Sequence, residues 1–218
     1  MRKQALYALV LAIVAIIIAA YGIVSYGWYT EEREQPLVDE DGILRSEIGY
    51  GLRGVNNRTL HRFNGTTLDE EEKVQGYDDF IGAKETKASA VASAMNILMI
   101  VALAMAVLFL PLVYLTSGGS FEQRVGKIGP YIPLLVAQVA ALLLIIGPIW
   151  FSYAFITALD DDIGRITGEP SQALGGMTGL WVIVGGILIQ MAAVMALSRT
   201  RLIYIEPLDE VKQAGPLD

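Results

Sequence analysis

Long apolar blocks alternate with charged connections along this chain. Four blocks contain no Asp, Glu, Lys or Arg, and they run from Ala5 to Tyr29, Ala88 to Leu115, Tyr131 to Ala158 and Gly175 to Leu197. A hydrocarbon layer about 30 Å thick needs roughly 20 helical residues at 1.5 Å each. The pattern therefore predicts four membrane-spanning helices.

A shorter period appears between the first two blocks, in residues 30–87. Apolar and polar residues partly alternate on either side of Val55–Arg58, which has turn chemistry. This pattern predicts a β-hairpin from about Ile43 to Phe63, with Trp28–Glu34 as a neighbouring strand. The acidic run Asp69–Lys73 is expected to be a solvated turn or the start of a helix.

The predicted fold class is an all-α transmembrane four-helix bundle with a small extracellular antiparallel β-layer from the first loop. The expected helices are 1–29, 88–115, 131–158 and 175–197. The connections are an extracellular β-rich loop (30–87), a cytoplasmic loop (116–130), a short extracellular loop (159–174) and a cytoplasmic tail (198–218).

Composition and charge support this arrangement. Hydrophobic residues make up 54% of the chain, and the mean hydropathy of +0.48 excludes most soluble domains. The net charge of −7 is concentrated in residues 30–87, which hold 14 Asp and Glu against 8 Lys and Arg. Basic residues favour the cytoplasmic side. In a four-pass arrangement, several basic residues fall on the side of the membrane opposite residues 30–87; they are Arg2, Lys3, Arg124, Lys127, Arg199, Arg201 and Lys212. We therefore expect a plasma-membrane protein with both termini in the cytoplasm.

The sequence offers no catalytic, cofactor-binding or metal-binding motif. It contains no cysteine, and its single histidine, His61, has no carboxylate or serine at a spacing that suggests a relay. Asp160–Asp162 lack the alternating ligand spacing of a calcium loop and are expected to be a solvated helix cap. We expect a protein that is not an enzyme and needs no cofactor.

Small and polar residues inside the blocks suggest helix packing. Gly175 and Gly179, and Ala88 and Ala92, place small residues on one helix face, where backbones can approach closely. The three uncharged polar residues expected to form a buried cluster are Asn96, Gln138 and Gln190. In residues 30–87, Asn57 and Asn64 begin possible glycosylation triplets.

The arrangement resembles the claudin and peripheral-myelin-protein-22 superfamily of four-pass membrane proteins. Trp28 follows the first helix, as a Trp does in that family, and Gly51-Leu52-Arg53 is similar to its Gly-Leu-Trp motif, with Arg in place of Trp. Val55 and Arg62 stand roughly where the two motif cysteines would lie. The resemblance implies cytoplasmic termini and a first external loop that forms a small sheet.

Two functions follow as expectations. The first is a non-enzymatic membrane protein whose external loop makes adhesive or lateral contacts with a second copy of the protein or with another surface protein. The expected partners are therefore such a protein and membrane lipid, and no nucleic acid is expected to bind. The expected contact residues are those apolar members of the loop that do not pack on the bundle, drawn from Tyr50, Leu52, Val55, Leu60 and Phe63. The alternative is an accessory subunit of a transporter, channel or enzyme complex that binds through its helices.

Overall fold

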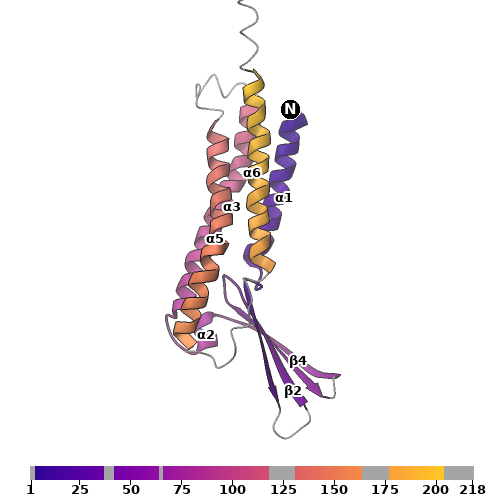
Figure 1. Ribbon diagram of the computed structural model, residues 1–218, viewed down its shortest axis with the longest axis vertical. Helices are drawn as coiled ribbons and strands as arrows, with labels where there is room; N and C mark the ends of the chain where they lie inside the picture. The colour runs from indigo at the N-terminus through magenta and orange to yellow at the C-terminus, as the bar shows by residue number, and fades with distance from the viewer. Residues whose placement is uncertain (1–2, 37–41, 64–65, 118–130, 164–176, 204–218) are drawn as a thin grey trace, which may run out of the picture.

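Four long helices and one small sheet make up the described part of the chain (Figure 1). A computed structural model describes residues 3–36, 42–63, 66–117, 131–163 and 177–203. The long helices are α1 (Lys3–Val24), α3 (Lys87–Ser117), α5 (Tyr131–Ile163) and α6 (Met177–Ile203). All four contain spans long and apolar enough to cross a membrane, which makes this a multi-pass membrane protein.

The helices pack through small residues. Ala15 and Ala19 of α1 lie against Gly185 of α6, where an added Cβ would come within 3.0 Å of α1 atoms. The predicted packing residues Ala88 and Ala92 are buried in α3, and Gly179 is buried in α6 beside Trp28 and Pro148. Gly175 lies outside the described residues. Close backbone approach of this kind suits helices that associate within lipid.

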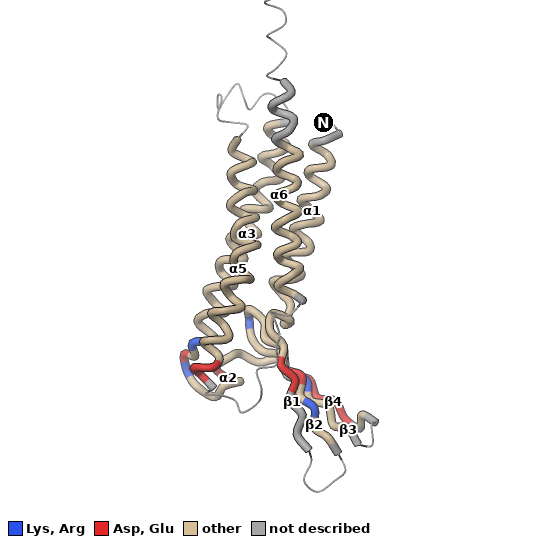
Figure 2. The backbone as a smooth tube through the Cα atoms, viewed as in Figure 1, with Lys and Arg blue, Asp and Glu red and all other residues tan. Residues whose placement is uncertain are grey.

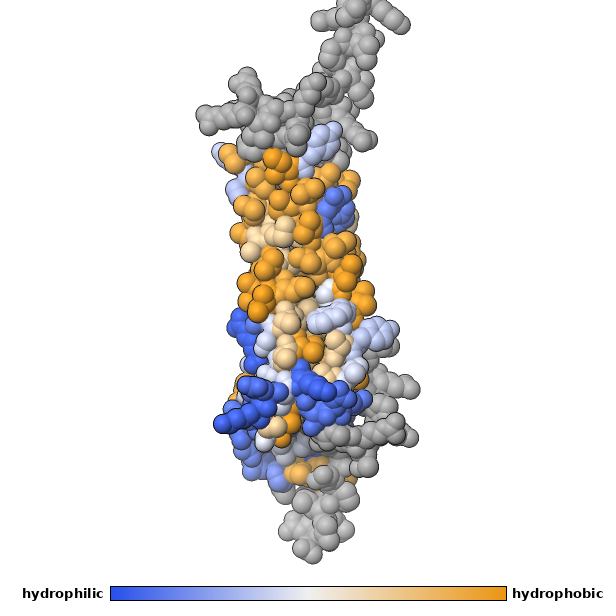
Figure 3. Space-filling model, turned by 90° about the vertical axis from the view of Figure 1, so that its left-hand side faces the viewer, coloured by the Kyte–Doolittle hydropathy of each residue, from blue (hydrophilic) through white to orange (hydrophobic). Residues whose placement is uncertain are grey.

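The exposed surface of the bundle is mostly apolar. The Lys, Arg, Asp and Glu residues that Figure 2 colours gather at the end of the bundle that carries the sheet. On the face seen in Figure 3, apolar side chains cover most of the helices apart from a small hydrophilic spot in the upper half, and most hydrophilic side chains gather at the sheet end. This division matches a hydrocarbon layer around the helices and water around the sheet.

The sheet has four antiparallel strands in the order β1-β2-β3-β4. They are β1 (Tyr29–Pro36), β2 (Gly42–Tyr50), β3 (Val55–Phe63) and β4 (Thr66–Gln75), followed by the short helix α2 (Tyr77–Ile81). The predicted hairpin and its neighbouring strand are therefore confirmed as elements. In Figure 1 the sheet extends away from the helices at the end opposite the N-terminus.

Two local predictions were wrong. The turn between β2 and β3 lies at Gly51–Gly54, where the Gly51 amide donates to the Gly54 carbonyl, and Val55 already belongs to β3. The acidic run Asp69–Lys73 is part of β4, not a turn or a helix start. Both of its faces are polar, so it lacks the apolar alternation that marks a half-buried strand.

The acidic end of α5 holds the start of α3. Asp162 accepts hydrogen bonds from the backbone amides of Lys87, at 3.1 Å, and Ala88, at 2.7 Å, while Asp161 pairs with the Lys87 ammonium at 2.9 Å. A carboxylate at a helix start satisfies amides that have no partner within the helix. The predicted cap is thus a bridge between two helices. Among the described residues no cluster of three or more potential metal ligands is present.

Candidate interaction site on the sheet

An aromatic cluster fixes the sheet to the bundle. Tyr50 of β2 is fully buried, and its ring lies 5.7 Å from that of Phe155 on α5 and 5.9 Å from that of Phe80 on α2. Phe155 also contacts Tyr77 at 5.6 Å and stacks on Phe151 at 4.8 Å. Interlocked aromatic rings bury large areas and have defined geometries. The base of the sheet is therefore held in one orientation.

Three of the apolar residues considered as contact residues, Tyr50, Leu52 and Val55, belong to this core instead, and Leu60 is buried on β3 outside it. Tyr50 and Val55 are 0% exposed, Leu52 is 3% exposed and Leu60 is 6% exposed. Buried side chains cannot form an exposed contact surface, and Tyr50, Leu52 and Val55 pack the sheet onto the helices. Phe63 pairs with Gly42 in the strand register.

Trp28 connects three parts of this junction. It is 2% exposed, its indole N–H donates to the Gly22 carbonyl of α1 at 2.9 Å, and its ring meets Phe151 of α5 edge to face. Its backbone amide donates to the Tyr50 carbonyl of β2. The Trp common to the resembled family thus lies between the bundle and the sheet.

The Gly51–Gly54 turn is tied to α2. The Tyr77 hydroxyl donates to the Gly51 carbonyl, and burial raises the pKa of that hydroxyl well above its usual range, so it remains a donor. Gly54 has a φ of +158°, and a Cβ there would lie 2.5 Å from the Gln75 carbonyl oxygen. The motif positions Gly51 and Leu52 are therefore structural residues.

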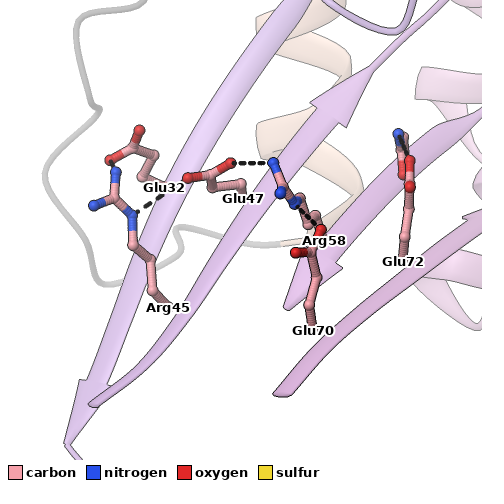
Figure 4. Close-up of polar contacts among 7 residues, drawn as sticks. Glu32, Arg45, Glu47, Arg58, Glu70 and Glu72 are labelled. Carbon is pink, nitrogen blue, oxygen red and sulfur yellow. Dashed lines mark hydrogen bonds and ion pairs between the residues drawn. The ribbon is translucent and has the colours of Figure 1, made fainter. Parts of the chain in front are cut away.

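One face of the sheet carries a ladder of charges that the sequence reading did not single out (Figure 4). Arg45 lies 2.7 Å from Glu32 and 3.5 Å from Glu47, and Arg58 lies 2.6 Å from Glu70 and 3.9 Å from Glu47. The members of this charged ladder are Glu32, Arg45, Glu47, Arg58, Glu70 and Glu72. Its signal in the sequence was weak, because only β2 alternates charged residues, at Arg45 and Glu47. On β3, Arg58 is followed by Leu60 on the same face, and β4 carries consecutive charges over Asp69–Lys73.

The ladder forms one wall of a groove, and the end of α1 forms another. The groove has a volume of about 900 Å³ and reaches from Tyr21 at the bundle to Glu70 and Glu72 on β4. The charged residues that line it are Glu31, Glu32, Glu47, Arg58, Glu70 and Glu72. These residues supply five carboxylates and one guanidinium, so we call this site the acidic groove.

Arg58 shapes the protonation of the groove. Its hydrogen bond to Glu70 lowers the pKa of the Glu70 carboxyl, and the same contact raises the pKa of Arg58. The lowered pKa means that this ion pair is present above the ordinary pKa of a Glu and is lost as the pH falls through the lowered value. The Glu70 carboxyl therefore keeps its negative charge in mildly acidic conditions.

Replacing Arg58 with Gln is expected to raise the pKa of Glu70 toward the ordinary value, because the charged donor that favours the carboxylate is gone. The pKa is measured from the pH dependence of the Glu70 side-chain carbonyl carbon resonance. An unchanged pKa in the variant would show that Arg58 is not its cause. Arg45→Gln is the control, since the resolved causes of the Glu70 shift do not include Arg45.

The remaining candidate residues do not gather here. Asn57 is half-buried in β3, between its pairing partners on β2 and β4, and Asn64 lies outside the described residues. The predicted polar cluster does not form: Gln138 is exposed on α5, and no hydrogen bond joins it to Asn96 or Gln190 among the described residues.

No family model matches the chain, and no curated protein matches it. The structure describes the three residues on which the expected resemblance to the claudin superfamily was based, Trp28, Gly51 and Leu52. Those three residues meet at the junction of sheet and bundle.

Proposed function

We propose that this protein is a claudin-like, non-enzymatic membrane protein that binds another surface protein through the acidic groove. The observation that carries the proposal is a groove with five carboxylates and one guanidinium on a sheet that aromatic packing holds against the bundle. A rigid, charged concave surface lowers the ordering cost of binding and selects partners by charge.

In this proposal the sheet lies outside the plasma membrane. In sequence, the basic residues near the chain ends and in the 116–130 connection adjoin the helix ends that lie away from the sheet, and positive charge favours the cytoplasmic side. Both termini are then cytoplasmic, with residues 30–87 and 159–174 outside. This orientation gives an external partner direct access to the acidic groove.

The partner's contacting surface is basic in this proposal. The groove carries a net negative charge, and the whole chain has a net charge of −7, so a basic protein meets less repulsion than a second copy. Charge complementarity of this kind accelerates encounter and weakens as salt rises, because exposed charges are screened within about 8–10 Å at physiological salt. Adhesion and lateral association both fit such a contact.

The test is reversal of charge in the groove. Replacing Glu70 and Glu72 with Arg is expected to lower partner binding about tenfold or more, since like charges at an interface are strongly unfavourable. Binding is measured on intact cells as the yield of partner crosslinks to Lys73 and Lys84, at low and at physiological salt. Arg is chosen because it adds no new lysine for the reagent.

The matched control reverses two charges on the other face of the same strand. Asp69 and Glu71 are exposed and alternate with Glu70 and Glu72 along β4, and they do not line the groove. Their replacement with Arg is expected to leave the crosslink yield within about twofold of the parent. Equal losses in the two double variants would contradict the groove as the binding site.

The alternative, an accessory subunit that binds through its helices, has one observation in its favour. Gln138 is exposed on α5 within a membrane span, where an amide gains from a hydrogen-bonding partner in a neighbouring helix. In that case Gln138→Leu abolishes co-purification of the partner in mild detergent, while the Glu70 and Glu72 reversal has no effect.

A further inference from the structure

A second groove lies where the sheet and α2 meet the first turns of α3. It has a volume of about 670 Å³ and is distinct from the acidic groove, since the two have no lining residue in common. The residues that line it are Leu52, Arg53, Gly76, Tyr77, Asp78, Asp79, Ser89, Ser93 and Asn96. We call it the interfacial groove.

The polar side chains that α3 places in this groove lack partners among the described residues. The Oδ1 atom of Asn96 is buried without a hydrogen bond, and neither Ser89 nor Ser93 uses its hydroxyl in one. Hydroxyls elsewhere in the spanning helices donate to carbonyls of the preceding turn, as Ser152 does to Pro148 and Thr157 does to Tyr153. The interfacial groove therefore offers hydrogen bonds that the helix itself does not use.

The position of the groove along α3 matches the polar boundary of a bilayer. A helix of 31 residues is about 46 Å long at 1.5 Å per residue, whereas the hydrocarbon layer is about 30 Å thick. If the overhang is shared between the ends, roughly the first five residues of α3 lie at headgroup level. Ser89 then stands among headgroups, Ser93 at the glycerol level and Asn96 just inside the hydrocarbon.

The charges at the mouth of the groove are of both signs. Arg53 is exposed and makes no ion pair with a described residue. Asp79 is also exposed, while Asp78 accepts hydrogen bonds from the amide and hydroxyl of Thr86. One guanidinium and two carboxylates at headgroup level complement a ligand that carries both a phosphate and an ammonium group.

We propose that the interfacial groove binds one zwitterionic phospholipid of the ethanolamine class. The Arg53 guanidinium binds its phosphate and the Asp79 carboxylate binds its ammonium group. Ser89 donates to a phosphate oxygen, and Ser93 and the Asn96 side-chain N–H donate to the ester carbonyls. A purely anionic lipid fits less well, because its headgroup meets the two carboxylates without a cation to offset them.

The experiment is native mass spectrometry of the full chain in detergent, titrated with phosphatidylethanolamine or phosphatidylglycerol of the same acyl chains. The parent protein is expected to retain one phosphatidylethanolamine with an affinity about tenfold higher than for phosphatidylglycerol. Replacing Ser89 and Ser93 with Ala lowers the phosphatidylethanolamine affinity about tenfold, as expected for two lost hydrogen bonds. Asp79→Asn reverses or removes the preference between the two lipids.

The control replaces Ser152 and Thr157 with Ala, which removes two hydroxyls that are already bonded within α5. This variant should bind phosphatidylethanolamine as the parent does. Equal binding of both lipids by the parent, or unchanged binding after the Ser89 and Ser93 replacement, overturns the proposal.

Discussion

Trp28→Ala is expected to lower the free energy of unfolding by about 3–5 kcal/mol, the usual cost of emptying a large aromatic site in a packed core. The side chain is 2% exposed and fills the junction between α1, α5 and β2. Alanine leaves a cavity there and leaves the Gly22 carbonyl without its indole donor. Thermal unfolding in detergent, followed by circular dichroism, measures the change.

Trp181→Ala is the matched control. Trp181 lies on α6 with 45% of its surface exposed, so its removal empties no packed site and should shift the unfolding temperature much less. Trp28→Phe should fall between Trp28→Ala and the parent protein, since it keeps a ring against Phe151 but cannot donate to Gly22. Similar losses for Trp28→Ala and Trp181→Ala would show that Trp28 does not hold the junction together.

Gly54→Ala should destabilise the sheet by about 3 kcal/mol or more, because two costs coincide. The φ of +158° is one that residues with a Cβ rarely adopt, and the added Cβ would lie 2.5 Å from the Gln75 carbonyl oxygen, where backbone must move. Faster amide exchange in β3 and β4, measured by mass spectrometry, would report this loss directly.

Gly76→Ala provides the comparison for that variant. Gly76 follows Gln75 directly, has a φ of −66°, and the nearest atom to an added Cβ is 3.8 Å away. Its replacement should leave amide exchange in β4 close to that of the parent. If Gly54→Ala behaves in the same way, the Gly51–Gly54 turn does not determine the pairing of β3 with β4.

Much of the architecture follows from the sequence because a bilayer restricts what can cross it. Only a helix satisfies its own backbone in hydrocarbon, so uninterrupted apolar blocks such as Ala88–Leu115 allow one solution. The hairpin was also readable, since Ile48 and Tyr50 alternate with polar neighbours. β4 was not, because its stability comes from pairing with β3 and from ion pairs such as that between Arg58 and Glu70, which join segments that are distant in the sequence.

The same distinction explains the error about the contact surface. Apolar residues in a charged loop, such as Leu52 and Val55, look like a binding face when the loop is considered alone. In the fold they pack against the bundle, which buries the apolar side chains at the base of the sheet. Charged residues of β2, β3 and β4 become neighbours only through strand register, so the acidic groove required the structure.

The most direct test of the proposed outward-facing contact surface is lysine crosslinking on intact cells with a membrane-impermeant reagent. Lys73 and Lys84 are exposed on the sheet side of the bundle, and Lys127 and Lys212 belong to the segments expected inside. The account predicts labelling of Lys73 and Lys84, with crosslinks to another surface protein. Labelling of Lys127 or Lys212 while Lys73 and Lys84 stay unmodified would contradict it.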